Sequence, residues 1–101
     1  MTNETIIVGE KTFFCSVTPA GPVNIVIASN EHGLVGCCSI DVDDLEGFGY
    51  AAAQVRPPEG RISVSTIDDL LRGFIKKANA PAKKKGVRIG MTGKEALAQL
   101  G

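Results

Sequence analysis

The chain has 101 residues, of which 44% are hydrophobic and 22% are charged. That length and balance are typical of one soluble globular domain, and they exclude disordered, collagen-like and disulfide-scaffold proteins. Eleven basic residues balance eleven acidic ones, so the formal net charge is zero. We therefore expect no nucleic-acid partner, because binding to phosphates requires a surplus of positive charge.

The two signs of charge are unevenly distributed along the chain. Residues 1–70 carry three basic and ten acidic residues, a net charge of −7, whereas residues 71–101 carry eight basic residues and one acid, a net charge of +7. Either these charges attract each other within the fold or between subunits, or the basic part forms a site for an anionic partner. Composition alone leaves both interpretations open.

The chain shows no sign of membrane insertion or export. No apolar run approaches the roughly 18 residues that would span a bilayer, and residues 1–4 lack the basic and apolar segments of a secretory signal. Two of the three cysteines, Cys37 and Cys38, are adjacent, a pattern that fits a reducing compartment. These features predict a cytoplasmic protein without a membrane partner.

Strands are predicted over the first part of the chain. β-forming side chains dominate residues 5–8 and 12–18, and the Gly-Glu pair between them predicts a hairpin. Two prolines and a glycine predict a loop over residues 19–22. Residues 23–28 are nearly all apolar, which is typical of a strand buried on both faces.

A further strand is predicted over residues 34–40, and the pattern changes after it. Gly36 within that strand indicates a bulge or a close backbone approach. Asp41 can cap a short helix over residues 42–46, whose early acids suit the positive end of the helix dipole. Residues 50–55 are then predicted to form a buried strand, because they are short, apolar and flanked by glycine and proline.

The clearest predicted helix begins after Thr66. Thr66 and Asp69 form a capping box at its start. Apolar side chains then recur on one face at helical spacing, namely Ile67, Leu70, Leu71, Phe74, Ile75 and Ala78. Gly73 and Pro81 weaken the helix, so we expect a break near Gly73 or a restart near Asn79.

The last part of the chain completes the predicted fold. Gly86 is expected to end the preceding helical segment, residues 87–89 to form a short strand, and Thr92 with Glu95 to cap a final helix. Together the elements predict a single α+β domain over residues 1–101. Its mixed, mainly antiparallel sheet has five to six strands, with two C-terminal helices packed on one face.

The other face of such a sheet would lack cover, because the sequence offers few helices. Apolar sheet surface that faces solvent commonly marks a contact between subunits. We therefore expect a homo-oligomer, and a dimer before any larger assembly.

Three segments of the chain resemble a known family. They are residues 36–41 (Gly-Cys-Cys-Ser-Ile-Asp), 66–71 (Thr-Ile-Asp-Asp-Leu-Leu) and 90–97 (Gly-Met-Thr-Gly-Lys-Glu-Ala-Leu). In order and spacing they resemble the YunC-like family of small prokaryotic proteins, a domain of unknown function, over most of the chain. The resemblance implies a compact α+β fold and implies no activity. It singles out Cys37, because family members carry Cys-Gly where this chain has Cys37 and Cys38.

The turn over residues 90–94 is a candidate anion site. It leads from a predicted strand to a helix N-terminus, where free N–H groups and the helix dipole favour a negative charge. Its candidate anion-binding residues are Thr92, Gly93 and Lys94. The turn departs from the phosphate-binding P-loop, since Arg88 stands where that pattern needs a glycine and Glu95 where it needs Ser or Thr. Capping of the helix by Glu95 is the alternative role of this turn.

A thiol site is the second candidate. A reactive thiol needs a base or a helix N-terminus that lowers its pKa. Cys37 precedes Asp41 and the helix that Asp41 caps, and His32, the only histidine, lies in the preceding turn. Cys37, His32 and Asp41 therefore form a candidate catalytic set. The alternative is plain packing, which is the commoner role of a free cysteine.

Two arginines provide a third candidate. Arg56 and Arg61 bracket the Pro57-Pro58 loop and can clamp a carboxylate or a phosphate, although a solvated loop is the simpler interpretation. No metal site and no cofactor are expected. The histidine and cysteines lack metal-ligand spacing, and the acids of residues 41–44 lack the calcium-loop pattern.

Two functions follow from these candidates. The first is a non-catalytic binding or assembly module that contacts a small anionic ligand. The second is a small thiol-dependent enzyme that uses Cys37. The first is preferred because no complete catalytic constellation is visible in the sequence, which leaves open whether the protein is an enzyme.

Overall fold

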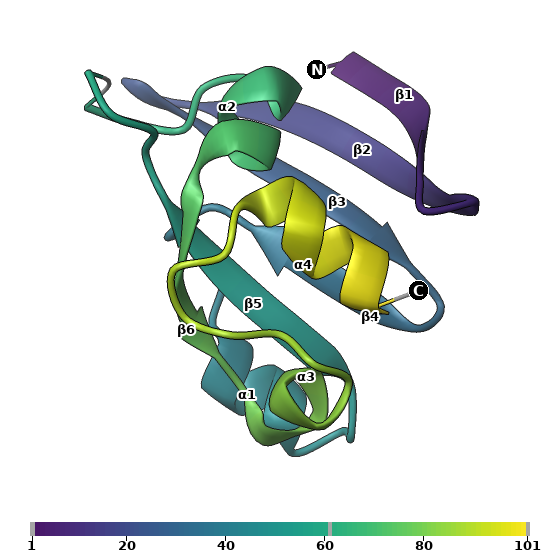
Figure 1. The fold of residues 1–101 in the computed structure, drawn as a ribbon. Coiled ribbons are helices and arrows are strands. Elements are labelled where there is room, and N and C mark those ends of the chain that lie inside the picture. Colours follow the sequence, from purple (N-terminus) through teal and green to yellow (C-terminus); the bar gives the residue numbers. More distant parts are fainter. Residues whose placement is uncertain (1, 61, 101) are drawn as a thin grey trace.

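A mixed sheet of six strands organises the residues that the computed structural model describes, 2–60 and 62–100 (Figure 1). The strands lie side by side in sequence order: β1 (Thr2–Val8), β2 (Lys11–Ala20), β3 (Val23–Asn30), β4 (Gly33–Gly36), β5 (Ala51–Arg56) and β6 (Phe74–Ala78). Neighbouring strands run antiparallel except β4 and β5, which are parallel. The predicted α+β class and its mainly antiparallel sheet are confirmed.

Two-residue turns join the first strands into a meander. Gly9 and Glu10 both adopt positive φ, 58° and 68°, as in a type I′ turn, whose twist matches the strands on either side. The loop predicted over residues 19–22 is too long, because Pro19 still pairs with β3. Within the described residues β1 pairs with β2 only as far as Val17. Pro19 has no backbone N–H to donate. It lies beyond the residues of β2 that pair with β1, so no hydrogen bond to β1 is lost there.

A short helix leads from β4 to the parallel strand β5. This helix, α1 (Val42–Glu46), begins at Asp41, whose carboxylate accepts hydrogen bonds of 3.0 and 3.2 Å from two N–H groups of the first turn. The predicted cap is confirmed. Val42 and Ala52 are fully buried but lie outside the main core cluster, because α1 packs against the other face of the sheet at β5.

The helix predicted after Thr66 is wrong beyond its first two turns. The segment contains α2 (Ile67–Arg72), then β6, then α3 (Ala80–Lys84). The predicted break at Gly73 and the restart at Asn79 are both present, and the chain between them pairs with β5. A Cβ on Gly73 would lie 2.5 Å from the Arg56 carbonyl oxygen. This contact brings residues 74–78 to the open edge of β5, where sheet pairing overrides the helical spacing of the side chains.

The last helix, α4 (Gly93–Leu100), covers the sheet together with α2. Residues 87–89 form no strand, so that prediction is wrong; they belong to the loop from α3 to α4. Figure 1 shows α2 and α4 on the same side of the sheet. The main core lies between these two helices and the sheet, and its largest fully buried side chains include Phe13, Val26, Val35, Val55, Leu70, Leu97 and Leu100. The predicted packing of C-terminal helices on one face is confirmed.

The opposite face of β1 to β4, here called the outer face, is open in the described chain. Ile7 and Phe14 project from it with 74% and 65% of their surface exposed. Ile27 and Leu34 lie on the same face and are half-buried. The outer face is therefore apolar at its centre and is covered by α1 only near β5.

Candidate functional site

Cys37 lies directly after β4, in a tight turn. The strand predicted over residues 34–40 stops at Gly36, because the Ile40 N–H donates to the Cys37 carbonyl at 3.2 Å and reverses the chain. A Cβ on Gly36 would lie 2.5 Å from the Ile40 side chain, which confirms the predicted close approach. Cys37 is 3% exposed, whereas Cys38 is exposed. The two thiols therefore differ in their exposure to solvent.

The Cys37 side chain lines a cavity of about 290 Å³. Segments that are far apart in the sequence meet there: the turn after β4, the end of β5, the loop from β5 to α2, and β6. Val55 and Val64 contribute apolar surface and are 0% and 6% exposed. Ser39 and Ser63 contribute hydroxyl groups. The cavity is thus apolar in its depth, whereas both polar and apolar side chains line it nearer to solvent.

Two cations line the same cavity. Arg56 ends β5, and its guanidinium carbon lies 5.5 Å from the centre of the Phe74 ring on the neighbouring strand. Lys76 lies on β6 and is exposed. In the described part of the chain, no carboxylate forms an ion pair with either residue. The cavity therefore carries positive charge that the described protein does not neutralise.

An irregularity in the sheet positions Lys76. Gln54 pairs with Lys77 and Val55 pairs with Ile75, so Lys76 is an extra residue with no partner on β5. An extra residue of this kind changes the direction of its side chain and often lies beside a functional site. The register shift explains why Lys76 lines the cavity although Lys77, its neighbour, pairs with Asp43 on α1.

The loop that forms one wall of the cavity is tied to the rest of the fold. Asn24 on β3 donates from its side-chain amide to the Ser65 carbonyl at 2.9 Å. The Ser65 N–H donates to the Asp69 carboxylate at 3.1 Å, and the Ser63 and Ser65 hydroxyl oxygens lie 3.0 Å apart. These bonds hold the described part of the loop against β3 and α2.

Two thiols line this cavity, the buried Cys37 and the exposed Cys38, and the Cys37 thiol is the one that the sequence singles out for covalent chemistry. Its sulfur has no hydrogen-bond partner among the described residues. The other buried cysteine, Cys15, lies in the main core, where burial and then the nearby Glu4 carboxylate raise its pKa to about 11. Cys15 is therefore a neutral thiol at physiological pH and is unsuited to nucleophilic attack.

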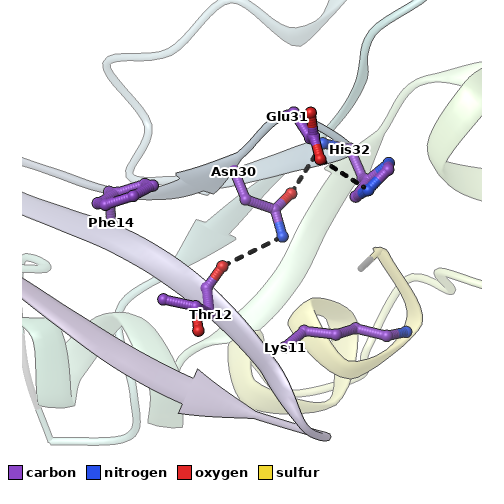
Figure 2. A pocket seen from close by; sticks show the side chains of 6 residues that line it. All are labelled: Lys11, Thr12, Phe14, Asn30, Glu31 and His32. Atoms are coloured by element: carbon purple, nitrogen blue, oxygen red, sulfur yellow. Dashed lines mark hydrogen bonds and ion pairs between the residues drawn. The ribbon is translucent and has the colours of Figure 1, made fainter.

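His32 lies at the other end of β4 from Cys37. The four residues of β4 lie between the two, so five steps along the chain separate them, which corresponds to about 16 Å. Figure 2 shows His32 beside Asn30 in a separate hollow, at the far side of which lies Phe14. The imidazole Nε2 lies 3.4 Å from the Glu31 carboxylate. The structure thus does not bring His32 to the Cys37 cavity.

Asp41 also lies apart from the Cys37 cavity. Its carboxylate caps α1 and lines a shallow hollow with Cys38 and Lys77 on the outer side of the turn. The three residues of the candidate catalytic set, Cys37, His32 and Asp41, therefore line three different hollows. Their joint role in catalysis stays a prediction that this geometry does not support.

The backbone donors of the predicted anion turn are largely engaged within the protein. The Thr92 N–H donates to the Glu95 carboxylate at 3.0 Å, and the Glu95 N–H donates to the Thr92 hydroxyl at 3.1 Å. The bond from the Thr92 N–H, and then a bond to the Thr92 side chain, lower the pKa of the Glu95 carboxyl group, and the reciprocal pair of bonds confirms the capping box. The Gly93 N–H donates to the Gly73 carbonyl at 2.9 Å, which leaves Lys94 as an exposed side chain at the start of α4.

Comparison with known proteins assigns the chain to a family. The sequence profile of a domain of unknown function, DUF1805, matches residues 36–100. This chain belongs to the DUF1805 family. It is 31% identical, over 105 residues, to the uncharacterized protein YunC of Bacillus subtilis, in an alignment that covers 99% of this chain and 98% of that protein. The predicted YunC-like resemblance is confirmed.

The fold also has a counterpart among solved structures. The crystal structure of TA1206, a protein of unknown function from Thermoplasma acidophilum, superposes with a TM-score of 0.85 at 21% identity, covering 99% of this chain and 92% of that one. The two proteins share a fold. The DUF1805 match begins at the end of β4, so it includes Cys37, Arg56 and Lys76 but not β1 to β3.

Three further sequence predictions for this DUF1805 protein concern a metal site, membrane insertion and an anion clamp formed by Arg56 and Arg61. Among residues 2–60 and 62–100, no group of three or more His, Cys, Asp or Glu side chains is placed to hold a metal ion. Every helix in the same part of the chain is too short or too polar to span a bilayer. Arg61, one of the two predicted clamp arginines, lies outside the described residues, whereas Arg56 lines the Cys37 cavity.

Sequence reasoning missed Lys76, Ser63 and Val64 as cavity residues. Lys76 fell within the helix predicted after Thr66, where it would have faced solvent. Its position depends on the pairing of β5 with β6 and on the register shift between them. No local pattern signals either feature, because both arise between segments about twenty residues apart.

Proposed function

We propose that this DUF1805 protein is a non-catalytic binding module that holds a small anion in the cavity lined by Cys37, Arg56 and Lys76. One observation carries the proposal: two cations without ion pairs in the described chain line one cavity. A carboxylate or a phosphate would neutralise them and accept hydrogen bonds from both. The other members of the candidate catalytic set lie at other hollows, which favours binding over catalysis.

The distribution of the other basic residues supports this choice of site. Lys77 pairs with Asp43, and that hydrogen bond raises the pKa of Lys77. Arg72 pairs with Asp68 at 2.8 Å. Part of the positive charge of residues 71–101 is thus neutralised by acids from residues 1–70. Arg56 and Lys76 form no ion pair with a described residue, so their charges are available to a ligand.

Ligand-dependent melting tests the proposal. Millimolar butyrate or inorganic phosphate should raise the melting temperature, because a ligand that binds only the folded state stabilises it by mass action. The double variant Arg56→Gln/Lys76→Gln should lose that increase. Lys84→Gln, which removes one charge from α3 away from the cavity, serves as the control and should keep it. An unshifted melting temperature for the original chain, or an equal loss in the control, would contradict the proposal.

A thiol-dependent enzyme is the second candidate function. It rests on the Cys37 sulfur, which lines the same cavity as Arg56 and Lys76. Iodoacetamide labelling of the folded protein below pH 7, followed by mass spectrometry, tests it. Cys37 should react faster than free glutathione under the same conditions. A Cys37 that reacts no faster than this free thiol would eliminate this candidate.

The assembly part of the proposal concerns the outer face, on which we place a second copy of the chain. Phe14 lies between two hollows of about 430 and 530 Å³ and lines both. A protruding Phe14 ring beside hollows of this size suits a two-fold symmetric dimer. In such a dimer, each subunit inserts its Phe14 ring into a hollow of the other subunit. The pairing would also cover Ile7, which is 74% exposed.

A further inference from the structure

We infer that the ligand of the Cys37 cavity is an amphipathic carboxylate, with one anionic head and an apolar body of several carbon atoms. The inference rests on the proposed anion-binding function and adds the chemical class of the ligand. It follows from the way in which polar and apolar groups are distributed over the cavity.

The depth of the cavity is apolar. Cys37, Val55 and Val64 line it and are 3%, 0% and 6% exposed, so their lining surface lies beneath the other residues. Val55 and Val64 are hydrocarbon side chains, and a buried cysteine packs as a small hydrophobic residue. A polar or fully hydrated ligand would lose its water contacts here without replacement, whereas a hydrocarbon chain would not.

The charges lie at the solvent side of the cavity. Arg56 and Lys76 are both exposed and both line it. Because the two cations come from neighbouring strands, they can contact one anionic head while the rest of the ligand extends inward. Inorganic phosphate presents oxygens in all directions, and the apolar depth offers few donors for those that face away from the cations.

Two exposed apolar side chains flank the entrance. Val23 at the start of β3 is 48% exposed, and Ile62 in the loop before α2 is 100% exposed, yet both line the cavity. An apolar ligand body between them would remove this surface from water, which is favourable. The volume of about 290 Å³ lies near the lower end of ligand pockets, which fits a small molecule.

A chain-length series tests the inference. Dissociation constants for acetate, butyrate and hexanoate are measured by calorimetry, with inorganic phosphate as the polar comparison. Affinity should rise about fourfold for each added methylene group, the value expected for its burial. Ile62→Ser should flatten this dependence on chain length. Ile89→Ser, which changes another exposed isoleucine outside the cavity, should leave it unchanged.

The outcomes separate the inference from the function on which it rests. Phosphate and acetate that bind as tightly as hexanoate, with binding lost in Arg56→Gln/Lys76→Gln, would overturn the inference and leave the anion-binding function standing. If both Ile62→Ser and the double variant bound hexanoate as tightly as the original chain does, binding would lie outside the cavity, and the inference and the proposed site would both be rejected. If none of the four anions bound, both would be rejected.

Discussion

Asn79 is a single residue that connects three elements of the fold. Its side-chain oxygen accepts hydrogen bonds of 3.1 Å from the N–H groups of Ala52 and Ala82. Its amide nitrogen donates to the carbonyls of Val42 and Tyr50 at 3.0 and 2.9 Å. Asn79 is 2% exposed, and three of the four bonds are buried, whereas the bond to the Tyr50 carbonyl is partly buried. This side chain thus caps α3 and fastens α1 to β5.

We predict that Asn79→Ala lowers the free energy of unfolding by about 3 kcal/mol, since it removes a helix cap and leaves several buried polar groups without partners. Urea unfolding measures the change. Asn3→Ala, on an exposed position of β1, should change stability by less than about 0.5 kcal/mol. Similar effects for the two variants would contradict the role assigned to Asn79.

Cys15 makes stability depend on pH in the alkaline range. The unfolded thiol ionises near its ordinary pKa of 9.0, whereas burial raises the folded value to about 11. Between these values the unfolded state loses a proton that the folded state keeps, so stability falls as pH rises. We predict a loss of about 2 kcal/mol by pH 11 from this group.

The difference in unfolding free energy between the original chain and Cys15→Ala isolates this effect, because other groups titrate equally in both. That difference should shrink between pH 8 and pH 11. Cys38→Ala, which changes an exposed thiol, gives the matched comparison. A difference for Cys15→Ala that stays constant over this range would show that the thiol is not held neutral by the fold.

At the scale of elements, the contact between α2 and α4 depends on a glycine. Gly93 begins α4, and a Cβ at this position would overlap the carbonyl oxygen of Leu70 in α2. The Gly93 N–H also donates to the Gly73 carbonyl at the end of α2. The glycine that suggested an anion-binding turn in the sequence therefore allows two helices to approach closely.

We predict that Gly93→Ala lowers the free energy of unfolding by more than about 2 kcal/mol, because the added methyl group forces the helices apart. Gly47→Ala is the matched control. Gly47 has φ −62°, and a Cβ there would be 3.4 Å from its nearest neighbour, the Asp44 carbonyl oxygen. The control should be neutral or slightly stabilising. Equal losses for the two variants in thermal unfolding would contradict this explanation.

The sequence correctly predicted the starts of the helices that begin with a capping residue. Asp41, Thr66 and Thr92 each accept hydrogen bonds from their helix N-termini, as their spacing indicated. Prediction failed for residues 74–78, whose apolar spacing fits a helix as well as it fits β6. A short apolar pattern cannot distinguish these states, so the neighbouring strand decided between them.

At the scale of the whole molecule, the sheet has one covered and one open face. The helices α2 and α4 bury the inner face, and α1 covers the outer face only near β5. Phe14 and Ile7 are left exposed on the outer face of the described chain. Exposed aromatic and aliphatic surface of this kind favours association with a second copy.

We predict a dimer at micromolar concentration in sedimentation experiments, and a monomer for Phe14→Lys, because the charge cannot enter the partner's hollow without losing its hydration. Ile89→Lys, on the loop between α3 and α4, serves as the control and should remain dimeric. Phe14→Lys should keep the original circular dichroism spectrum. A monomeric original chain, or dissociation of both variants, would rule out the outer face as the interface.

The amino-acid sequence by itself determined the α+β class, the helix caps and the hairpin turns, because each of these depends on interactions among residues a few positions apart. The Cys37 cavity was decided only by the tertiary structure. Its residues span the chain from Val23 to Lys76, and they meet because β4 pairs with β5 and because the register of β5 and β6 shifts by one residue. Pairing over such distances depends on the whole sheet, so no local pattern records it.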